Sequence, residues 1–198
     1  MNMETLQEEG LVAFPSGEDF LANRELSDRL YTYALLYGGY LDTGMFSNSF
    51  SSRGLYKKLG ISYRLMQKQL YNMVSANYFK QNGAEYLLDI NPSGYTRYVD
   101  REILEKLYEE NISDLIKVYI YLSSLYSVYK DKAWFSYNTI ATALGYKAQR
   151  CMSNKNKMQE LVTKLKELGL VKYKQNPNSN IYKISFILTY VKINSKKE

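Results

Sequence analysis

The apolar residues of the chain fall at helical spacing in two stretches, and each stretch ends in two β-prone runs. The first stretch opens with a helix whose apolar face consists of Leu26, Leu30, Tyr33, Ala34 and Tyr37. This helix should end at Gly38-Gly39, because glycine commonly terminates helices. A polar, serine-rich loop follows, and residues 52–59 then predict a short helix that ends at Gly60.

A longer helix is predicted directly after this glycine, with Ser62 as its N-cap. Its apolar stripe consists of Met66, Leu70, Met73 and Val74. Asn82-Gly83 then lies between two β-prone runs, which predicts a hairpin with a type I′ turn. The first stretch therefore predicts a helix, a loop, a short helix, a longer helix and a hairpin, in that order.

The second stretch repeats this order of elements. Its first helix would bury Ile112, Leu115, Ile116, Tyr119, Leu122 and Tyr126. Residues 136–144 predict a short helix that is capped by Ser136 and followed by Gly145. A longer helix then ends at Gly169, and its apolar stripe consists of Met158, Leu161, Val162, Leu165 and Leu168. A second hairpin follows, with the polar loop NPNSN (residues 176–180) between its strands.

This repetition predicts a mainly α fold with small β-hairpins (class α+β) in two tandem domains. We expect the first domain at residues 24–92 and the second at residues 112–192, joined by a linker helix at residues 93–111. Residues 1–23 have five acids and no base, and we expect them to form an acidic N-terminal tail. Residues 193–198 are expected to form a basic tail.

The charge of the chain is concentrated in its second half. The formal net charge is +6, and residues 147–174 alone have eight bases and two acids. A concentrated basic segment is typical of proteins that bind a polyanion. The alternative is a solvated helix face with no partner.

Composition and motifs exclude several classes of chemistry. The chain has one cysteine and no histidine, which excludes a disulfide framework, a cysteine-based zinc site and histidine-dependent triads. It has no P-loop and no GxGxxG motif, and no apolar run approaches the roughly 20 residues that span a bilayer. We therefore expect a cytoplasmic protein that is not an enzyme, uses no cofactor and no metal, and has no membrane partner.

Tyrosine is unusually frequent, with 21 residues among the 198 of the chain. At helical spacing, tyrosine is more typical of a core with its hydroxyl at the rim than of a stacking surface. We interpret most of these residues as structural. A surface that stacks the bases of a single strand is the alternative.

Two segments of the second stretch are similar to a known family. The sequence FSYNTIATALGY, followed by NKMQELVTKLKELGLVKYK, combines a short helix, a glycine turn and a longer helix ending in Leu-Gly-Leu-Val. Residues 113–175 resemble the winged helix-turn-helix modules of bacterial transcription regulators and of plasmid and phage replication initiators. The first stretch, with KLGIS and QLYNMVSANYFK, is similar. The resemblance implies tandem winged helix-turn-helix DNA-binding domains, a layout found in several plasmid replication initiators.

In such a module the longer helix enters the major groove, and the hairpin or wing contacts phosphates. Polar residues opposite the apolar stripe are therefore candidates for DNA contact. On the first longer helix these are Arg64, Gln67, Lys68 and Tyr71. The second longer helix offers Ser153, Asn156, Lys157, Glu160, Thr163 and Lys164, and the second wing offers Lys172, Lys174 and Lys183. The alternative for each helix is the ordinary solvated face of an amphipathic helix.

Together these features predict a non-enzymatic protein that binds double-stranded DNA in a sequence-specific manner. The favoured role is replication initiation, or its control, on a plasmid-like or phage-like element. A dimeric transcription regulator that binds a promoter or operator is the first alternative. A second copy of the chain and the replication or transcription machinery are therefore further candidate partners. A protein-interaction module that does not bind DNA is the second alternative.

Overall fold

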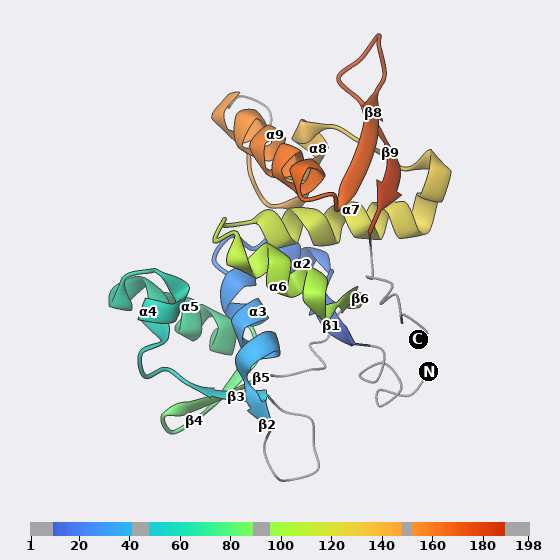
Figure 1. The fold of residues 1–198 in the computed structure, drawn as a ribbon. Coiled ribbons are helices and arrows are strands. Elements are labelled where there is room, and N and C mark those ends of the chain that lie inside the picture. Colours follow the sequence, from blue (N-terminus) through green and yellow to red (C-terminus); the bar gives the residue numbers. More distant parts are fainter. Residues whose placement is uncertain (1–9, 41–47, 89–95, 148–151, 189–198) are drawn as a thin grey trace, which may run out of the picture.

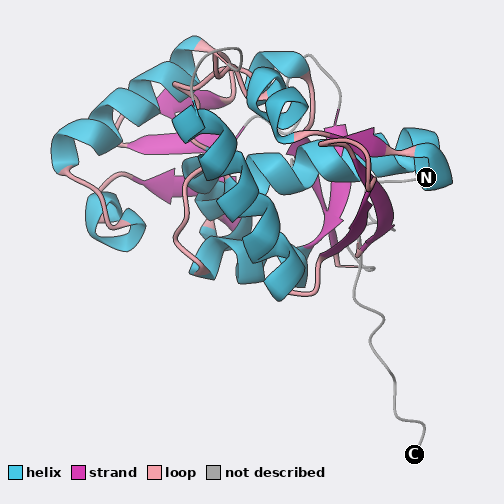
Figure 2. Ribbon diagram, turned by 90° about the horizontal axis from the view of Figure 1, so that it is seen from above, coloured by secondary structure: helices cyan, strands magenta, loops and turns pink. Residues whose placement is uncertain are grey.

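The structure is a computed structural model that describes residues 10–40, 48–88, 96–147 and 152–188. It combines helices with three antiparallel sheets, in agreement with the predicted α+β class (Figure 1). In the view from above, the strands lie in two groups on opposite sides of the central helices (Figure 2).

The first half of the chain contains the elements that its apolar pattern predicts. They are α3 (Asp28–Tyr37), α4 (Leu55–Leu59), α5 (Tyr63–Ser75), β4 (Phe79–Asn82) and β5 (Glu85–Leu88). Two short strands, β2 (Gly39–Tyr40) and β3 (Asn48–Ser51), were not predicted, and β3 lies where the serine-rich loop was expected. The strands form one sheet in the order β2-β3-β5-β4. The Ser62 side chain caps α5 by accepting a hydrogen bond from the backbone N–H of Leu65. Gly60 ends α4 with a φ of +66°, in the left-handed region that favours glycine.

The predicted hairpin is confirmed, but its turn lies one residue later than expected. Asn82 pairs with Glu85, so the two-residue loop is Gly83-Ala84. Gly83 has a φ of +59°, whereas Ala84 is not among the described residues with positive φ. A type I′ turn needs positive φ at both loop residues, so the predicted turn type was wrong.

The second half repeats the first. Its elements are α7 (Leu115–Tyr129), the 3-10 turn η1 (Lys130–Lys132), β7 (Trp134–Phe135), α8 (Tyr137–Ala143), α9 (Met152–Glu167), β8 (Val171–Gln175) and β9 (Tyr182–Ile187). Their strands form a sheet in the order β7-β9-β8, which matches the order β3-β5-β4 of the first half. Ser136 caps α8 through a capping box with Thr139, as its position in the sequence predicts. Each half thus has a helix, a strand, a short helix, a longer helix and a hairpin.

The predicted acidic tail needs a correction, because its described part belongs to the fold. Residues 10–22 contain β1 (Leu11–Pro15) and α2 (Glu18–Leu21), while residues 1–9 lie outside the described residues. Phe14 and Phe20 are fully buried, with ring centroids 5.2 Å and 5.5 Å from that of Tyr31. The acids Glu18 and Asp19 face solvent in the first turn of α2. The prediction of a tail was based on the acids alone and did not consider Phe14 and Phe20, which pack this segment into the core.

The predicted linker helix is also corrected. Residues 96–100 form β6 (Thr96–Asp100), which pairs with β1, and only then does α6 (Arg101–Glu109) begin. Asp100 caps α6, accepting a hydrogen bond from the N–H of Glu102. The inner side of α6 packs in the core through Ile103, Leu104 and Leu107. This segment is thus a strand and a helix within the fold rather than a connection between separate domains.

The two halves share one core. A single cluster of buried apolar side chains extends from Phe14 to Ile187 and includes residues of both halves. No helix in the described ranges is long and apolar enough to cross a membrane. The end of the second predicted domain, residues 189–192, and the basic tail at residues 193–198 lie outside the described residues.

Candidate nucleic-acid interface

Helix α5 has its polar residues on the side opposite the core, as the sequence predicts. Its buried side consists of Met66, Leu70 and Met73. Arg64 and Lys68 are exposed, Gln67 is half-buried, and Tyr71 is 72% exposed. A tyrosine side chain with that much exposure is unusual for a core residue at the rim. The four predicted contacts on α5 thus lie together on one accessible face.

Three further basic residues beside α5 were missed by the sequence analysis. Arg53, Lys57 and Lys58 lie in or just before α4 and are exposed. From Asn48 to Ala84 the sequence has six bases and no acid. A charge count over the whole first domain includes the acids of neighbouring elements and hides this run. The unit formed by α4, α5 and β4, which we call the α4–α5 unit (residues 48–84), is therefore purely basic.

Lys68 forms an exposed, and therefore weak, ion pair with Glu25. Its Nζ lies 3.1 Å from Glu25 Oε1, and both side chains are more than 60% exposed. The Asn72 side-chain amide also donates a hydrogen bond to the Glu25 carbonyl oxygen, at 3.3 Å. An ion pair between such exposed groups contributes about 0–1 kcal/mol, so Lys68 can exchange Glu25 for another anion.

Helix α9 also buries four residues of its predicted stripe, which are Met158, Leu161, Val162 and Leu165. Leu168, the fifth, is half-buried and follows the end of the helix. Ser153, Asn156 and Thr163 are exposed, as expected, and so is Glu160. The two predicted lysine contacts differ from the expectation, because Lys157 and Lys164 form ion pairs within the protein. The exposed face of α9 is therefore polar, with less free positive charge than its sequence suggests.

Lys157 belongs to a partly buried polar cluster. Its Nζ lies 2.6 Å from Asp114 Oδ2 and 2.6 Å from the Tyr146 hydroxyl, which in turn donates to Asp114 at 2.5 Å. Burial alone would raise the pKa of Asp114, but hydrogen bonds from Lys157 and Tyr146 hold that pKa below its ordinary value. Burial would lower the pKa of Lys157, but hydrogen bonding to Asp114 and Tyr146 raises it. Both groups therefore stay charged, and Lys157 has a structural role.

The third helix of each half, α5 or α9, forms an ion pair with the segment that precedes the first helix of that half. Lys164 of α9 lies 2.6 Å from Glu110, in the connection that precedes α7. Lys68 of α5 contacts Glu25, in the connection that precedes α3. In each half a lysine on the third helix thus pairs with an acid just before the first helix. The Lys164 pair is less exposed than the Lys68 pair, so Lys164 is held more firmly.

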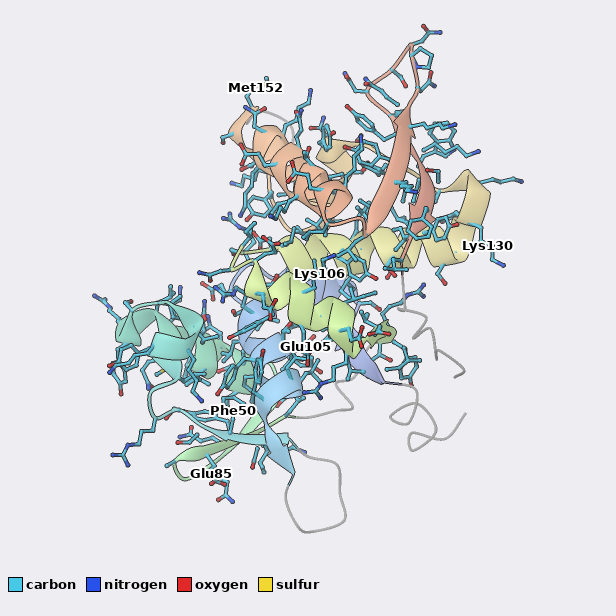
Figure 3. All side chains as sticks on the ribbon, in the orientation of Figure 1. Phe50, Glu85, Glu105, Lys106, Lys130 and Met152 are labelled. Atoms are coloured by element: carbon cyan, nitrogen blue, oxygen red, sulfur yellow. The ribbon has the colours of Figure 1, made fainter. Side chains whose placement is uncertain are left out.

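The second wing presents its lysines to solvent. Lys172 and Lys174 are exposed, and Lys183 is half-buried. Lys174 is the cross-strand partner of Lys183. The wing loop is ordered by its own hydrogen bonds, because the N–H of Asn176 donates to the Ile181 carbonyl oxygen at 2.9 Å. The side chains of this wing are visible at the end of the molecule away from α4 and α5 (Figure 3).

The described residues thus offer two basic surfaces, the α4–α5 unit and the second wing, on elements of opposite halves. The first wing is mixed in charge, with Lys80 exposed on β4 and Glu85 exposed on β5.

Comparison of the chain with protein-family models, with curated proteins and with solved structures gives no match. The function is therefore inferred from these side chains alone.

Proposed function

We propose that the protein binds double-stranded DNA in a sequence-specific manner through two winged helix-turn-helix units, without enzymatic activity. The single observation on which the proposal rests is the α4–α5 unit. It is basic throughout and exposes Arg64 on a helix that follows a tight glycine turn. Arginine binds guanine and glutamine binds adenine through paired hydrogen bonds in the major groove. Arg64 and Gln67 are the residues of α5 that we expect to read bases.

The second unit would contribute mainly through its wing. Because Lys157 and Lys164 are paired within the protein, α9 offers the neutral donors Ser153, Asn156 and Thr163. Lys172 and Lys174 would neutralise phosphates and fix the register of the protein on the duplex. If both units dock on one side of the duplex, the site spans about two helical turns.

The role that best fits two such units in one chain is replication initiation, or its control, on a plasmid-like or phage-like element in the cytoplasm. A dimeric transcription regulator would use the same contacts. Selection of bound duplexes from a random library, followed by footprinting, separates the two roles. Direct repeats support the initiator, whereas a single palindrome supports the regulator. Recovery of no enriched sequence would contradict specific binding.

One feature favours the alternative function of protein interaction. A groove of about 810 Å³ lies between α2, α7 and α8 and is lined by mostly apolar groups, among them Leu21, Leu125 and Ala143. Val128 at its edge is 71% exposed. Salt dependence separates this function from DNA binding. Neutralising about five phosphates gives a log–log slope near −4 to −5, whereas binding that does not change with salt would contradict the DNA proposal.

A further inference from the structure

The second wing has an outer face that duplex binding does not fully explain. Cross-strand partners point to the same side of a sheet. Trp134 pairs with Lys183, and Lys183 pairs with Lys174, so these residues form one row across β7, β9 and β8. Lys172, two residues before Lys174 on β8, lies on the same side of the sheet. Its partner Phe186 also lies on this side, because a β-bulge shifts the register between Lys172 and Tyr173. We call these five residues the outer wing face.

The opposite face of this sheet is already occupied by the core. Val171, Ile184 and Ile187 are buried there. Its aromatic rings pack on one another, because the ring centroid of Phe135 lies 5.3 Å from that of Tyr182 and 5.5 Å from that of Tyr173. The packing of the core therefore accounts for the aromatic residues on the inner face and not for those on the outer face.

The outer wing face has two aromatic rings open to solvent. Trp134 is 45% exposed and Phe186 is 36% exposed. They lie on different strands of the sheet, and the pair between their two rows, Tyr173 with Ile184, faces the core. An exposed aromatic ring on a flat sheet offers a surface on which an unpaired base can stack, and all four bases can do so. Bases within a duplex already stack on each other and offer no such surface.

The charge of this face fits a polyanion. The sequence of β7, β8 and β9 has three lysines and no acid. Lys174 and Lys183 lie directly opposite each other, an arrangement that is unfavourable for like charges unless an anion lies between them. Lys172 Nζ lies 5.6 Å from the ring centroid of Phe186, so cation and ring are presented together. Lys130, labelled in Figure 3, begins the 3-10 turn η1, whose sequence Lys-Asp-Lys has a net charge of +1, just before β7.

We propose that the outer wing face binds single-stranded nucleic acid. Bases stack on Trp134 and Phe186, while Lys172, Lys174 and Lys183 neutralise the neighbouring phosphates. The lysines serve a duplex as well, but the two aromatic residues serve only unpaired bases. The second wing would then contact a duplex through its lysines alone and an unpaired strand through its lysines and both rings, while the α4–α5 unit contacts only the duplex.

Trp134 makes a direct test possible, because it is the only tryptophan of the chain. Its fluorescence is followed while a thymidine oligonucleotide of about 12 nucleotides is added to the full-length protein, a length within the range that such sites cover. We expect saturable quenching, and weaker quenching by a duplex of the same length. Unchanged emission at saturating oligonucleotide, or equal quenching by the duplex, would overturn the proposal.

Variants identify the contribution of the second ring. Phe186→Ala keeps the Trp134 reporter, and we expect oligonucleotide affinity to fall about tenfold, the order expected for one lost base stack. Phe186→Leu keeps the apolar bulk of the side chain without a π-face, and its affinity for the oligonucleotide should fall by the same factor. This second variant decides the question if Phe186→Ala folds poorly. The matched control is Tyr98→Ala, because Tyr98 is 43% exposed on β6, outside this sheet. Equal affinity of Phe186→Leu and the wild type would contradict stacking on this face.

This proposal and the duplex proposal can fail separately. Arg64→Ala, on the α4–α5 unit, should leave the quenching of Trp134 by the oligonucleotide unchanged. Loss of oligonucleotide binding in Arg64→Ala would place the single strand on α5 and contradict the outer wing face as its site. Quenching that persists in a protein with no affinity for duplex would support the single-strand site and refute only the duplex proposal.

Discussion

Gly145, in the turn that follows α8, lies directly against the backbone of Ala22, just after α2. A Cβ at Gly145 would be 2.0 Å from the Ala22 carbonyl oxygen. Gly145 also has a φ of +71°, a conformation that residues with a side chain rarely adopt. The contact joins the N-terminal segment to the second half, and the Arg24 guanidinium extends it by lying 4.2 Å from the ring centroid of Tyr146.

Replacement of Gly145 by alanine should therefore lower the free energy of unfolding much more than the same change at Gly54. Gly54 has a φ of +72°, but nothing lies within 4 Å of its added Cβ. Gly54→Ala should lose about 1–2 kcal/mol from backbone strain alone. Gly145→Ala adds a backbone clash and should lose about 4 kcal/mol. Urea unfolding of both variants measures the difference, and equal losses would show that Ala22 moves aside without cost.

The sequence predicted those features of the fold that depend on neighbours along the chain. Ser62 and Ser136 were recognisable as caps, and Gly60 and Gly145 as helix ends, because each signal lies within a few residues. The contact between Gly145 and Ala22 could not be predicted, because it joins residues that are distant in sequence. The pairing of β1 with β6, such as Val12 with Val99, was missed for the same reason.

In the candidate site, too, the sequence predicted what depends on neighbouring residues and missed contacts between residues distant in sequence. Helical periodicity placed Arg64 and Tyr71 on the outer face of α5, and the structure agrees. The same argument placed Lys157 outward, but a long side chain can turn back towards an acid on another element. Asp114 lies 43 positions before Lys157 in the sequence, and no periodicity within α9 indicates that contact.

The buried carboxyl of Asp28 should make folding depend on pH. Asp28 is 3% exposed, and burial, followed by the nearby charge of Asp114, raises its pKa from 3.8 to about 6. Lys117 opposes this shift, but its own pKa is lowered by burial. A raised carboxyl pKa means that the neutral form is favoured in the folded state. The raised pKa of Asp28 therefore adds to the free energy of unfolding at low pH. This added stability is complete below about pH 4 and is lost as the pH rises through about 6.

Asp28→Asn keeps this position neutral at every pH. Relative to the wild type, its free energy of unfolding should therefore rise by about 3 kcal/mol between pH 4 and pH 7, from a pKa shift of about two units. Urea unfolding across this range measures the difference. Asp19→Asn removes one negative charge from an exposed position of α2 and is the control. A wild type and Asp28→Asn with parallel pH profiles would show that Asp28 ionises freely in the fold.

Lys157 should matter for stability rather than for DNA binding. Lys157→Gln leaves the Asp114 carboxylate, 14% exposed, without its ion-pair partner. We expect a loss of about 2 kcal/mol, between the values for surface and buried pairs, and a partial recovery in Asp114→Asn/Lys157→Gln. Lys155→Gln, on the same helix, should change stability by less than about 0.5 kcal/mol. A Lys157→Gln protein with wild-type stability and weaker duplex binding would return Lys157 to the DNA interface.

Arg64 and Gln67 should determine which sequence is bound. Arg64→Ala/Gln67→Ala removes two candidate base contacts from α5, each corresponding to roughly 1–3 kcal/mol of discrimination. Binding to the selected site should weaken towards the affinity for random duplex. Lys80→Ala/Gln81→Ala removes one cation and one amide from β4 of the same unit, so it should weaken binding to every duplex without changing the preference for the selected site. Unaltered preference in the α5 variant, measured by competition between selected and random duplexes, would contradict docking through this helix.

Lys172 and Lys174 should determine how strongly any duplex is bound. Lys172→Gln/Lys174→Gln removes two phosphate contacts, so affinity should fall for every sequence and the log–log salt slope should flatten by about 2. Lys106→Gln/Lys166→Gln removes the same charge from exposed positions of α6 and α9 that were not predicted contacts. Because net charge is equal in the two variants, a difference in slope measures local phosphate contact. Equal slopes would mean that only overall charge attracts the duplex and that the second wing does not touch it.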